Sequence, residues 1–336
     1  MLDKRLRDLM LAMVLEKIGF PLVQKELPCP VPGEFEVLIA VKSCGVCRTD
    51  LHIVDGELDC PKLPLILGHQ IVGTVKALGS KVTSFHIGQR VGVPWLGGCC
   101  NLCEFCLEGK ENLCDEGVFT GYQRNGGYAE FCTAKEEFVL PLFSQYEDAH
   151  MAPLLCAGLI GYRAFRLAGV KKNIGFYGFG SSAHILIQVA SFLGVDVYVF
   201  TRPGNSKSQD FARSLGAKWV GGSDELPPVP LEAALIFAPQ GELYPQALKA
   251  VRKGGKVLSA GIHMSDIPSF AYSLLWGERS LSSVSNLTRQ DGRDFMKLIS
   301  EIELKLSITT FPLKQANEAL ALMRNGSFTG SIVLTC

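Results

Sequence analysis

Four cysteines stand close together in the middle of the chain, and their spacing is that of a metal site. Cys100, Cys103, Cys106 and Cys114 form the run C-x2-C-x2-C-x7-C. Thiolates at such spacings wrap one tetrahedral Zn²⁺, with Zn–S distances near ~2.3 Å, and close its coordination shell. The same run could hold an iron–sulfur cluster. The stretch from about 97 to 116 therefore predicts a lobe built around a structural metal, and its surroundings favour zinc.

A second set of cysteine and histidine residues is spread over three distant segments. These are Cys44-Gly-Val-Cys47-Arg-Thr-Asp50-Leu-His52, then Gly68-His69-Gln70, and much later Leu155-Cys156-Ala-Gly158. Cys44 and Cys47 form a C-x2-C pair and are rival candidates for a metal ligand. The cysteines without a motif are interpreted as ordinary thiols: Cys29, Cys60, Cys99, Cys132 and Cys336.

A third motif predicts a dinucleotide-binding turn. The apolar strand Ile174–Tyr177 leads directly into Gly178-Phe-Gly180-Ser181-Ser182-Ala183, and a helical pattern follows. In this G-x-G-x-x-A pattern the first glycine permits a tight turn, the second lets the backbone approach a pyrophosphate, and the alanine allows close packing of helix on strand. The phosphates would accept from backbone N–H groups at the start of the helix.

The end of the following strand bears on which dinucleotide is bound. An acidic residue there normally accepts from the adenosine ribose. Asp196 opens the strand instead of ending it, and the ribose position falls on Thr201 or Arg202, with Lys207 nearby. Neutral and cationic groups suit a 2′-phosphate, so we expect NADP, with NAD as the alternative; a solvated arginine at the start of a loop is the plainer interpretation.

The alternation of apolar and polar residues divides the chain in two. From residue 11 to about 145, short β-branched runs alternate with Gly and Pro, at Glu36–Val41, Ile71–Leu78, Arg90–Val93 and Gly127–Thr133. From about 150, apolar strands alternate with amphipathic helices, which is the pattern of a parallel, doubly wound sheet. Near the end, Pro312–Met323 predicts a helix and Gly330–Thr335 a strand.

Composition excludes several classes of protein. The 336 residues carry a formal net charge of zero, which gives no electrostatic basis for binding nucleic acid. No apolar run approaches the ~20 residues that span a membrane. The basic start and the apolar run Leu9–Leu15 mimic a signal peptide, but Glu16 and Lys17 end the run, which favours a first β-strand. Cysteines at metal-ligand spacings favour a reducing compartment, so we expect the cytoplasm.

Taken in their order along the chain, the two ligand sets and the dinucleotide motif resemble the zinc-dependent medium-chain alcohol dehydrogenases. The resemblance runs from about residue 11 to the end. It implies an α/β fold in which a Rossmann doubly wound parallel sheet is inserted in a GroES-like β-rich catalytic domain. The implied domains are residues 1–149, the Rossmann domain at 150–285, and a return to the catalytic domain at 286–336.

The resemblance also implies roles for single residues. Cys47, His69 and Cys156 match the family's catalytic zinc ligands, and a second, structural zinc would occupy the four-cysteine lobe. Thr49 matches the hydroxyl that touches the substrate oxygen, and His52 the outer base of the proton relay. Arg48 matches a contact to the cofactor pyrophosphate, and Asp50 would orient His69. Gln70 departs from the family, which usually has Glu there, so a negative charge near the zinc is lost.

The expected activity is reversible hydride transfer between a primary or secondary alcohol and a nicotinamide cofactor. A small-molecule alcohol, aldehyde or ketone would be the substrate, and the chain would form a homodimer or homotetramer. The alternatives are a polyol or formaldehyde dehydrogenase of the same superfamily, a non-catalytic nucleotide-binding sensor, and a zinc-ribbon module for nucleic acid. The zero net charge and the second ligand set argue against the last.

Overall fold

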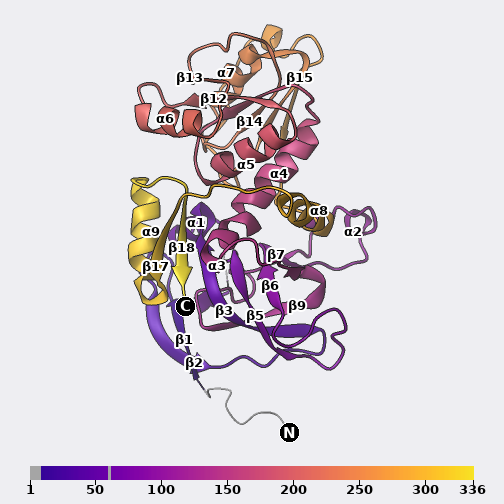
Figure 1. The fold of residues 1–336 in the computed structure, drawn as a ribbon, viewed down its shortest axis with the longest axis vertical. Coiled ribbons are helices and arrows are strands. Elements are labelled where there is room, and N and C mark those ends of the chain that lie inside the picture. Colours follow the sequence, from indigo (N-terminus) through magenta and orange to yellow (C-terminus); the bar gives the residue numbers. More distant parts are fainter. Residues whose placement is uncertain (1–8, 60–61) are drawn as a thin grey trace. The chain divides into compact units, whose positions relative to one another are not determined.

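The computed structural model of the chain describes residues 9–59 and 62–336, which form two compact units (Figure 1). One unit comprises the described residues up to Cys156 together with Thr288–Met296 and Ser307–Cys336. The other comprises Ala157–Leu287 and Lys297–Leu306. The first division thus falls after Cys156 and not after residue 149, so Cys156 remains in the unit that holds Cys47 and His69. The basic residues at the start of the chain and Cys60 lie outside the described residues.

The first unit is organised by a seven-stranded sheet with the order β10-β6-β5-β3-β18-β17, in which β9 also pairs with β3. Its strands are β3 (Glu36–Val46), β5 (Ile71–Leu78), β6 (Arg90–Val93), β9 (Phe131–Lys135), β10 (Leu140–Pro141), β17 (Ile308–Pro312) and β18 (Ser331–Thr335). The long strand β3 is apolar and largely buried, as expected of a central strand. Strand β18 pairs antiparallel with β3, with Ile332 opposite Val46, so the end of the chain belongs to this unit.

Two smaller sheets and several helices complete the first unit. The order β2-β1-β4 joins β2 (Val23–Pro28), β1 (Leu9–Leu15) and β4 (Leu65–Ile66), which confirms the predicted strand at Leu9–Leu15; β7 (Leu96–Gly98) pairs with β8 (Val118–Phe119). The helices are α1 (Arg48–Asp55), α2 (Glu104–Leu107), α3 (Asp148–Met151) and α9 (Ala316–Asn325), with 3₁₀ turns η1 (Glu111–Leu113), η2 (Glu136–Phe138), η3 (Ala152–Leu155) and η5 (Leu313–Gln315). Helix α8 (Arg289–Ile299) begins in this unit, and its residues from Lys297 on belong to the other. Helix α9 packs on β17 and β18 (Figure 1).

The second unit is a doubly wound parallel sheet, as the sequence predicts. Its strand order is β13-β12-β11-β14-β15-β16, and every neighbouring pair is parallel. The strands are β11 (Asn173–Tyr177), β12 (Asp196–Thr201), β13 (Trp219–Gly222), β14 (Leu231–Ile236), β15 (Val251–Ser259) and β16 (Ser280–Ser283). The helices are α4 (Ala157–Ala168), α5 (Ser181–Phe192), α6 (Ser206–Ser214) and α7 (Leu243–Ala250), with the 3₁₀ turn η4 (Tyr272–Leu274). This order is that of the Rossmann fold.

Two of the predicted elements are misplaced. The strand expected at Gly127–Thr133 begins only at Phe131, because the backbone before it bonds elsewhere: Tyr128 N–H donates to Leu67 and its carbonyl accepts from Met13. The helix expected from Pro312 begins at Ala316. Pro312 instead ends β17, where its missing N–H costs no ladder hydrogen bond.

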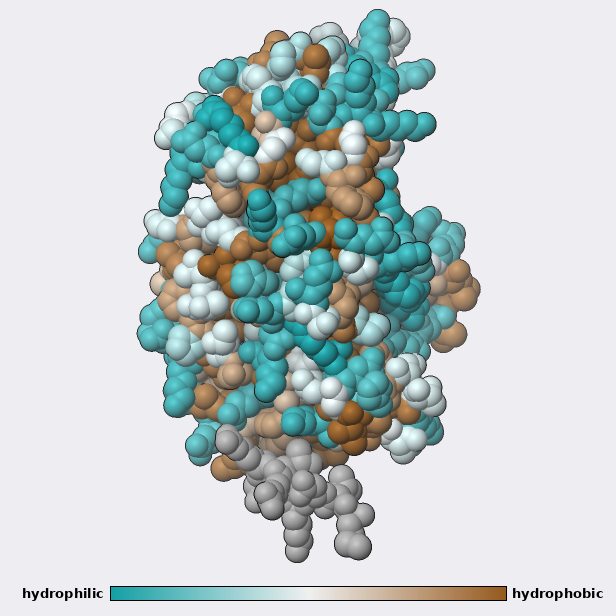
Figure 2. Space-filling model, in the orientation of Figure 1, coloured by the Kyte–Doolittle hydropathy of each residue, from teal (hydrophilic) through white to brown (hydrophobic). Residues whose placement is uncertain are grey.

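The surface is mixed. Figure 2 shows hydrophilic and apolar residues interspersed over the visible face, with apolar residues exposed at the edge over α2. Among residues 9–59 and 62–336, no helix is both long enough and apolar enough to cross a membrane.

Candidate metal centres and dinucleotide site

The four-cysteine run folds into a compact lobe. Cys103 and Cys106 lie at the short helix α2, Cys100 precedes it, and Cys114 follows η1. Their four sulfur atoms lie within 4.8 Å of one another. The Sγ atoms of Cys100 and Cys106 are 3.9 Å apart, and those of Cys100 and Cys114 are 3.5 Å apart. Two ligands of a tetrahedral zinc with Zn–S bonds near ~2.3 Å would be about 3.8 Å apart. The cluster therefore fits one Zn²⁺.

Backbone groups around Cys100 also suit a thiolate. The N–H groups of Leu102 and Cys103 point at its Sγ, at 3.4 and 3.3 Å, and lower the pKa of the thiol to about 7. A metal ligand must be deprotonated, so these donors favour metal binding at neutral pH.

One arginine ties this lobe to the start of α8. The carboxylate of Glu111 is almost fully buried and accepts from the backbone N and Nε of Arg289, at 2.8 and 2.9 Å. Arg289 also reaches Glu137 and lies over the ring of Phe138. Apolar support is small, since besides cysteines the core of the lobe has Leu96 and Phe138 buried and Phe119 partly buried against them. Metal and ion pair thus take the place of a hydrophobic core.

The second metal centre brings together three segments of the first unit. Cys47 stands between β3 and α1, His69 lies two residues before the start of β5, and Cys156 follows directly after η3. One ligand atom from each lies within 4.8 Å of the other two, and the Sγ atoms of Cys47 and Cys156 are 3.9 Å apart. This separation again fits two thiolates on one zinc. Cys44, the rival ligand, lies three residues before Cys47 on β3, is fully buried and belongs to neither cluster.

The carboxylate of Asp50 organises this centre. Its Oδ2 accepts from the backbone N–H of Cys47 at 2.8 Å and from the hydroxyl of Tyr128 at 3.0 Å. Its Oδ1 lies 3.5 Å from Nδ1 of His69. Burial lowers the pKa of His69, but Asp50 and Cys47 outweigh burial and raise it to about 10. Because Nδ1 faces Asp50, Nε2 is the nitrogen available to a metal.

Close packing fixes the turn that carries His69. Gly68 has φ = 95°, and a Cβ there would come within 2.4 Å of the Tyr128 ring and 2.7 Å of Cys44 Sγ. Only glycine fits this position. The next residues pack equally closely, since the buried side chain of Gln70 lies against Gly45 on β3. Gln70 therefore has a packing role in the wall behind the ligands.

Helix α1 carries the predicted relay residues away from this centre. Thr49 Oγ1 lies 3.6 Å from Cys47 Sγ. His52 is three residues further and so lies on the same face of the helix, where both side chains are buried. Nδ1 of His52 contacts the carboxylate of Glu57. Arg48, at the start of the helix, is exposed.

The dinucleotide motif has the predicted strand–turn–helix context in the second unit. Strand β11 ends at Tyr177, α5 begins at Ser181, and Gly180 is its N-cap. A Cβ on Gly180 would meet nothing within 4 Å, so the turn is open to a ligand. Ser181 and Ser182 supply N–H groups in the first turn, and Ala183 is fully buried. The turn therefore fits a pyrophosphate.

The three residues predicted at the ribose end of this site differ in how accessible they are. Asp196 begins β12, at the edge opposite the turn, as predicted. Thr201 is buried: its hydroxyl accepts from Gln209 Nε2 at 3.2 Å and lies 3.5 Å from the carbonyl of Gly221. Arg202 and Lys207 are exposed beside the start of α6. Of the three residues, Thr201 is the least accessible to a ribose.

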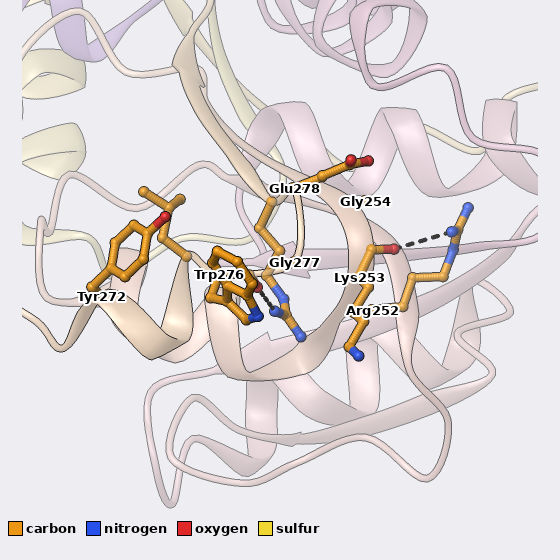
Figure 3. Close-up of a pocket in the computed structure, with 9 residues that line it drawn as sticks. Arg252, Lys253, Gly254, Tyr272, Trp276, Gly277 and Glu278 are labelled. Atoms are coloured by element: carbon orange, nitrogen blue, oxygen red, sulfur yellow. Dashed lines mark hydrogen bonds between the residues drawn. The ribbon is translucent and has the colours of Figure 1, made fainter.

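A separate hollow of about 770 Å³ opens on the second unit (Figure 3). It lies between Arg252–Gly254 of β15 and the segment Tyr272–Arg279. None of its residues belongs to the metal centres or to the dinucleotide turn. We therefore do not assign this hollow to the active site.

Three residues at these sites are absent from the sequence-based predictions. Tyr128 supports Asp50, Arg289 holds Glu111, and Glu57 contacts His52. Tyr128 and Arg289 are far in sequence from their partners and carried no signal. Glu57 did have one, because it directly follows a glycine placed to cap α1.

Comparisons with known proteins agree with this arrangement. The family model described as "Alcohol dehydrogenase GroES-like domain" matches residues 33–144, and "Zinc-binding dehydrogenase" matches residues 194–334. The chain is similar to "Probable alcohol dehydrogenase AdhA" of Mycobacterium tuberculosis, with 41% identity over 322 residues that cover 94% of this chain and 92% of the relative. It is 33% identical to an alcohol dehydrogenase of Geobacillus stearothermophilus over 345 residues, 97% of this chain and 99% of the relative.

The fold is also found among solved structures. Acetophenone reductase from Geotrichum candidum, solved in complex with NAD, superposes with a TM-score of 0.88 at 26% identity and covers 99% of this chain and 98% of its own. The predicted combination of a GroES-like domain and a Rossmann sheet is thereby confirmed.

Proposed function

Because the chain belongs to the zinc-dependent medium-chain alcohol dehydrogenase family, we propose that Cys47, His69 and Cys156 are its catalytic zinc ligands. The enzyme transfers hydride reversibly between an alcohol and a nicotinamide cofactor. The observation that carries the site assignment is the Cys–His–Cys cluster, in which His69 is buried and the two cysteines are partly buried, with their Sγ atoms 3.9 Å apart and the hydroxyl of Thr49 beside them. Zn²⁺ bound there supplies a Lewis acid that polarises the substrate oxygen and lowers the pKa of the alcohol.

The protein groups around this cluster have distinct tasks. Thr49 contacts the substrate oxygen and passes the proton of the alcohol to His52, which lies one helical turn away and is the outer base. Asp50 holds the imidazole of His69 so that Nε2 faces the metal. The turn from Gly178 to Ala183 binds the cofactor pyrophosphate. The four thiolates of Cys100, Cys103, Cys106 and Cys114 hold a structural zinc.

An assay of the purified enzyme with NAD and NADP tests this function. We expect alcohol-dependent reduction of the cofactor, two zinc ions per chain by elemental analysis, and loss of turnover when Cys156 is replaced by Ser. Absence of turnover at full zinc and cofactor occupancy would contradict the proposal and favour a nucleotide-binding sensor.

Aromatic rings beside His69 favour apolar substrates over polyols. The ring of Trp95 meets that of His69 edge-on, with centroids 4.8 Å apart. Phe119 and Tyr122 stack on Trp95 at 5.1 and 5.9 Å. Such a wall offers mainly apolar ring area, and the hydroxyl of Tyr122 already donates to the carbonyl of Asp59. We expect a higher kcat/KM with benzyl alcohol than with sorbitol or glycerol, and the reverse order would support the polyol alternative.

The charge beside α6 supports a preference for NADP. Arg202 and Lys207 are exposed there, and no carboxylate ends β12. A charge-assisted hydrogen bond to a 2′-phosphate is worth roughly 1.5–3 kcal/mol, which corresponds to about ten- to a hundredfold in affinity. Arg202→Ala should lower kcat/KM with NADP by that factor and spare NAD. Arg213→Ala, on α6, is the matched control, and a wild type that prefers NAD would refute the preference.

A second copy of the chain has an open strand edge to pair with. Strand β16 ends the sheet of the second unit, its sequence Ser-Leu-Ser-Ser has no charge or proline, and the exposed rings of Tyr272 and Trp276 lie beside it on the rim of the hollow in Figure 3. Edges of this kind favour strand addition. We expect a homodimer or a tetramer built from such dimers by light scattering, and Leu281→Lys should yield monomers.

The cytoplasm remains the proposed location. The cysteines of the described part carry no disulfide, and six of them stand in the two proposed zinc centres. Thiolate ligands persist best in a reducing compartment.

A further inference from the structure

The imidazole of His52 has a charged partner that lies at the surface. Nδ1 of His52 contacts the carboxylate of Glu57, and the two side chains are 9% and 42% exposed. We propose that Glu57 is a positioning residue of the reaction: it orients His52 and stabilises the imidazolium that forms when His52 accepts the proton of the alcohol. This inference rests on the proposed function of His52 as the outer base.

The end of α1 places Glu57 against His52. The helix ends at Asp55, and Gly56 takes the left-handed conformation with φ = 74°. Glycine adopts this conformation without strain, and the chain turns back over the last helical turn. The backbone N–H of Glu57 then donates to the carbonyl of His52 at 2.9 Å. Backbone and side chain of Glu57 therefore engage the same residue, which fixes the pair by local geometry.

The carboxylate determines which nitrogen of His52 can act as the base. A carboxylate only accepts hydrogen bonds, so Nδ1 carries the proton of the neutral imidazole and Nε2 keeps its lone pair. During oxidation the O–H bond of the alcohol breaks, the proton passes by way of the Thr49 hydroxyl to Nε2, and the imidazolium later releases a proton to water. None of these residues changes its oxidation state.

Burial decreases along this path. Thr49 and His52 are buried on one face of α1, whereas Glu57 reaches solvent. A base that is shielded from water benefits most from a fixed counter-charge, because the cation it forms is poorly solvated. Glu57 supplies that charge at the point where the proton leaves the protein.

Other charged groups from α1 and α9 share this region. Arg324 of α9 donates to both carboxylate oxygens of Asp55, at 2.7 Å each. Arg324 also interacts electrostatically with Glu57, and Asp55 with His52. Two carboxylates against one guanidinium leave one net negative charge beside the imidazole.

The test is Glu57→Gln in the zinc-loaded enzyme, with kcat and kcat/KM for alcohol oxidation measured from pH 5 to 10. We expect a three- to tenfold fall in kcat, within the ~10²-fold contribution of a general base. The acidic limb of the kcat/KM profile should move to lower pH by about half a unit to one unit, because the imidazolium loses its counter-charge. Glu57→Asp should recover part of both effects. Glu16→Gln removes a similarly exposed carboxylate that pairs with Lys25, and should change neither.

A double mutant distinguishes this role from a structural one. If Glu57 acts through His52, then Glu57→Gln should have no further effect in the His52→Ala background. Additive effects, or a wild-type profile in Glu57→Gln while His52→Ala is impaired, would overturn the inference and leave the proposed function intact. Wild-type rates in His52→Ala would overturn the relay and the inference together. A wild type without alcohol turnover would instead contradict the proposed function.

Discussion

The two metal centres of the first unit are built in opposite ways. The four-cysteine lobe takes its ligands from one short stretch, Cys100 to Cys114, with a core of two apolar side chains and leucines exposed around it. The Cys47–His69–Cys156 centre takes its ligands from three segments and lies against the main core, where Asp50 and Tyr128 are fully buried. We therefore expect the lobe to depend on its metal for folding. The Cys47–His69–Cys156 centre should instead keep its structure without the metal, because the main core holds its ligands in place.

This difference separates stability from activity. A lobe with few apolar contacts depends on zinc, because metal binding there is folding free energy. The Cys47–His69–Cys156 centre is held in place by hydrogen bonds to Asp50 and by close packing around Gly68. Ligand substitutions at the two centres should therefore have different consequences.

The largest effect is expected on turnover at the buried centre. Cys47→Ser removes one thiolate, and a Lewis acid that supplies several kcal/mol of transition-state stabilisation is lost. At about 1.4 kcal/mol per decade, kcat should fall on the order of 10³-fold or more. Zinc content should drop from two to one per chain, measured by elemental analysis, and the melting temperature should change little.

The control for this substitution is Cys29→Ser, since Cys29 belongs to neither metal cluster. It should keep both zinc ions and the wild-type kcat. A Cys47→Ser variant that retains turnover, or that unfolds like a lobe variant, would remove the contrast between the two centres.

The next effect is on stability at the lobe. Cys103→Ser should lose the structural zinc and several kcal/mol of folding free energy. With roughly 2–4 °C per kcal/mol for units of this size, the melting temperature should fall by about 10 °C. Calorimetry and zinc analysis check this. An unchanged melting temperature would show that the lobe folds without its metal.

The smallest effect concerns the ion pair that holds the lobe. Burial raises the pKa of the Glu111 carboxyl, but the N–H groups of Arg289 outweigh burial and lower it. A carboxyl with a depressed pKa in the folded state stabilises the protein above its unfolded pKa of ~4.3, and that contribution is lost as pH falls through the folded value. Glu111→Gln should cost about 1–3 kcal/mol at pH 7 and less below pH 4.

Urea unfolding at pH 7 and at pH 3 measures this difference, with Glu104→Gln on α2 as the control. Equal destabilisation by Glu111→Gln at both pH values would mean that packing, and not charge, makes Glu111 important.

Much of the fold could be predicted from the sequence because its signals are local. Period and turn residues located β1, β5, β6 and the alternating elements of the second unit, and G-x-G-x-x-A fixed the junction of β11 and α5. A strand was predicted wrongly where the backbone forms hydrogen bonds with residues far away in the sequence. Gly127–Glu130 resembles a strand in sequence, but its hydrogen bonds go to Leu67 and to β1, which no local pattern reveals.

By itself, the sequence predicted the four-cysteine cluster and the dinucleotide turn, because each depends on residue types at fixed spacing. The order of its motifs also indicated the family, and the Cys47–His69–Cys156 set was predicted through that resemblance. Only the tertiary structure decided which groups serve these residues. Tyr128 meets Asp50 from 78 positions away, and Arg289 meets Glu111 from 178 positions away. It also turned Thr201 inward and set Glu57 on His52. The physical reason is that metal ligands and glycine turns are specified by the chemistry of neighbouring residues, whereas hydrogen bonds and counter-charges depend on where the folded chain places distant ones.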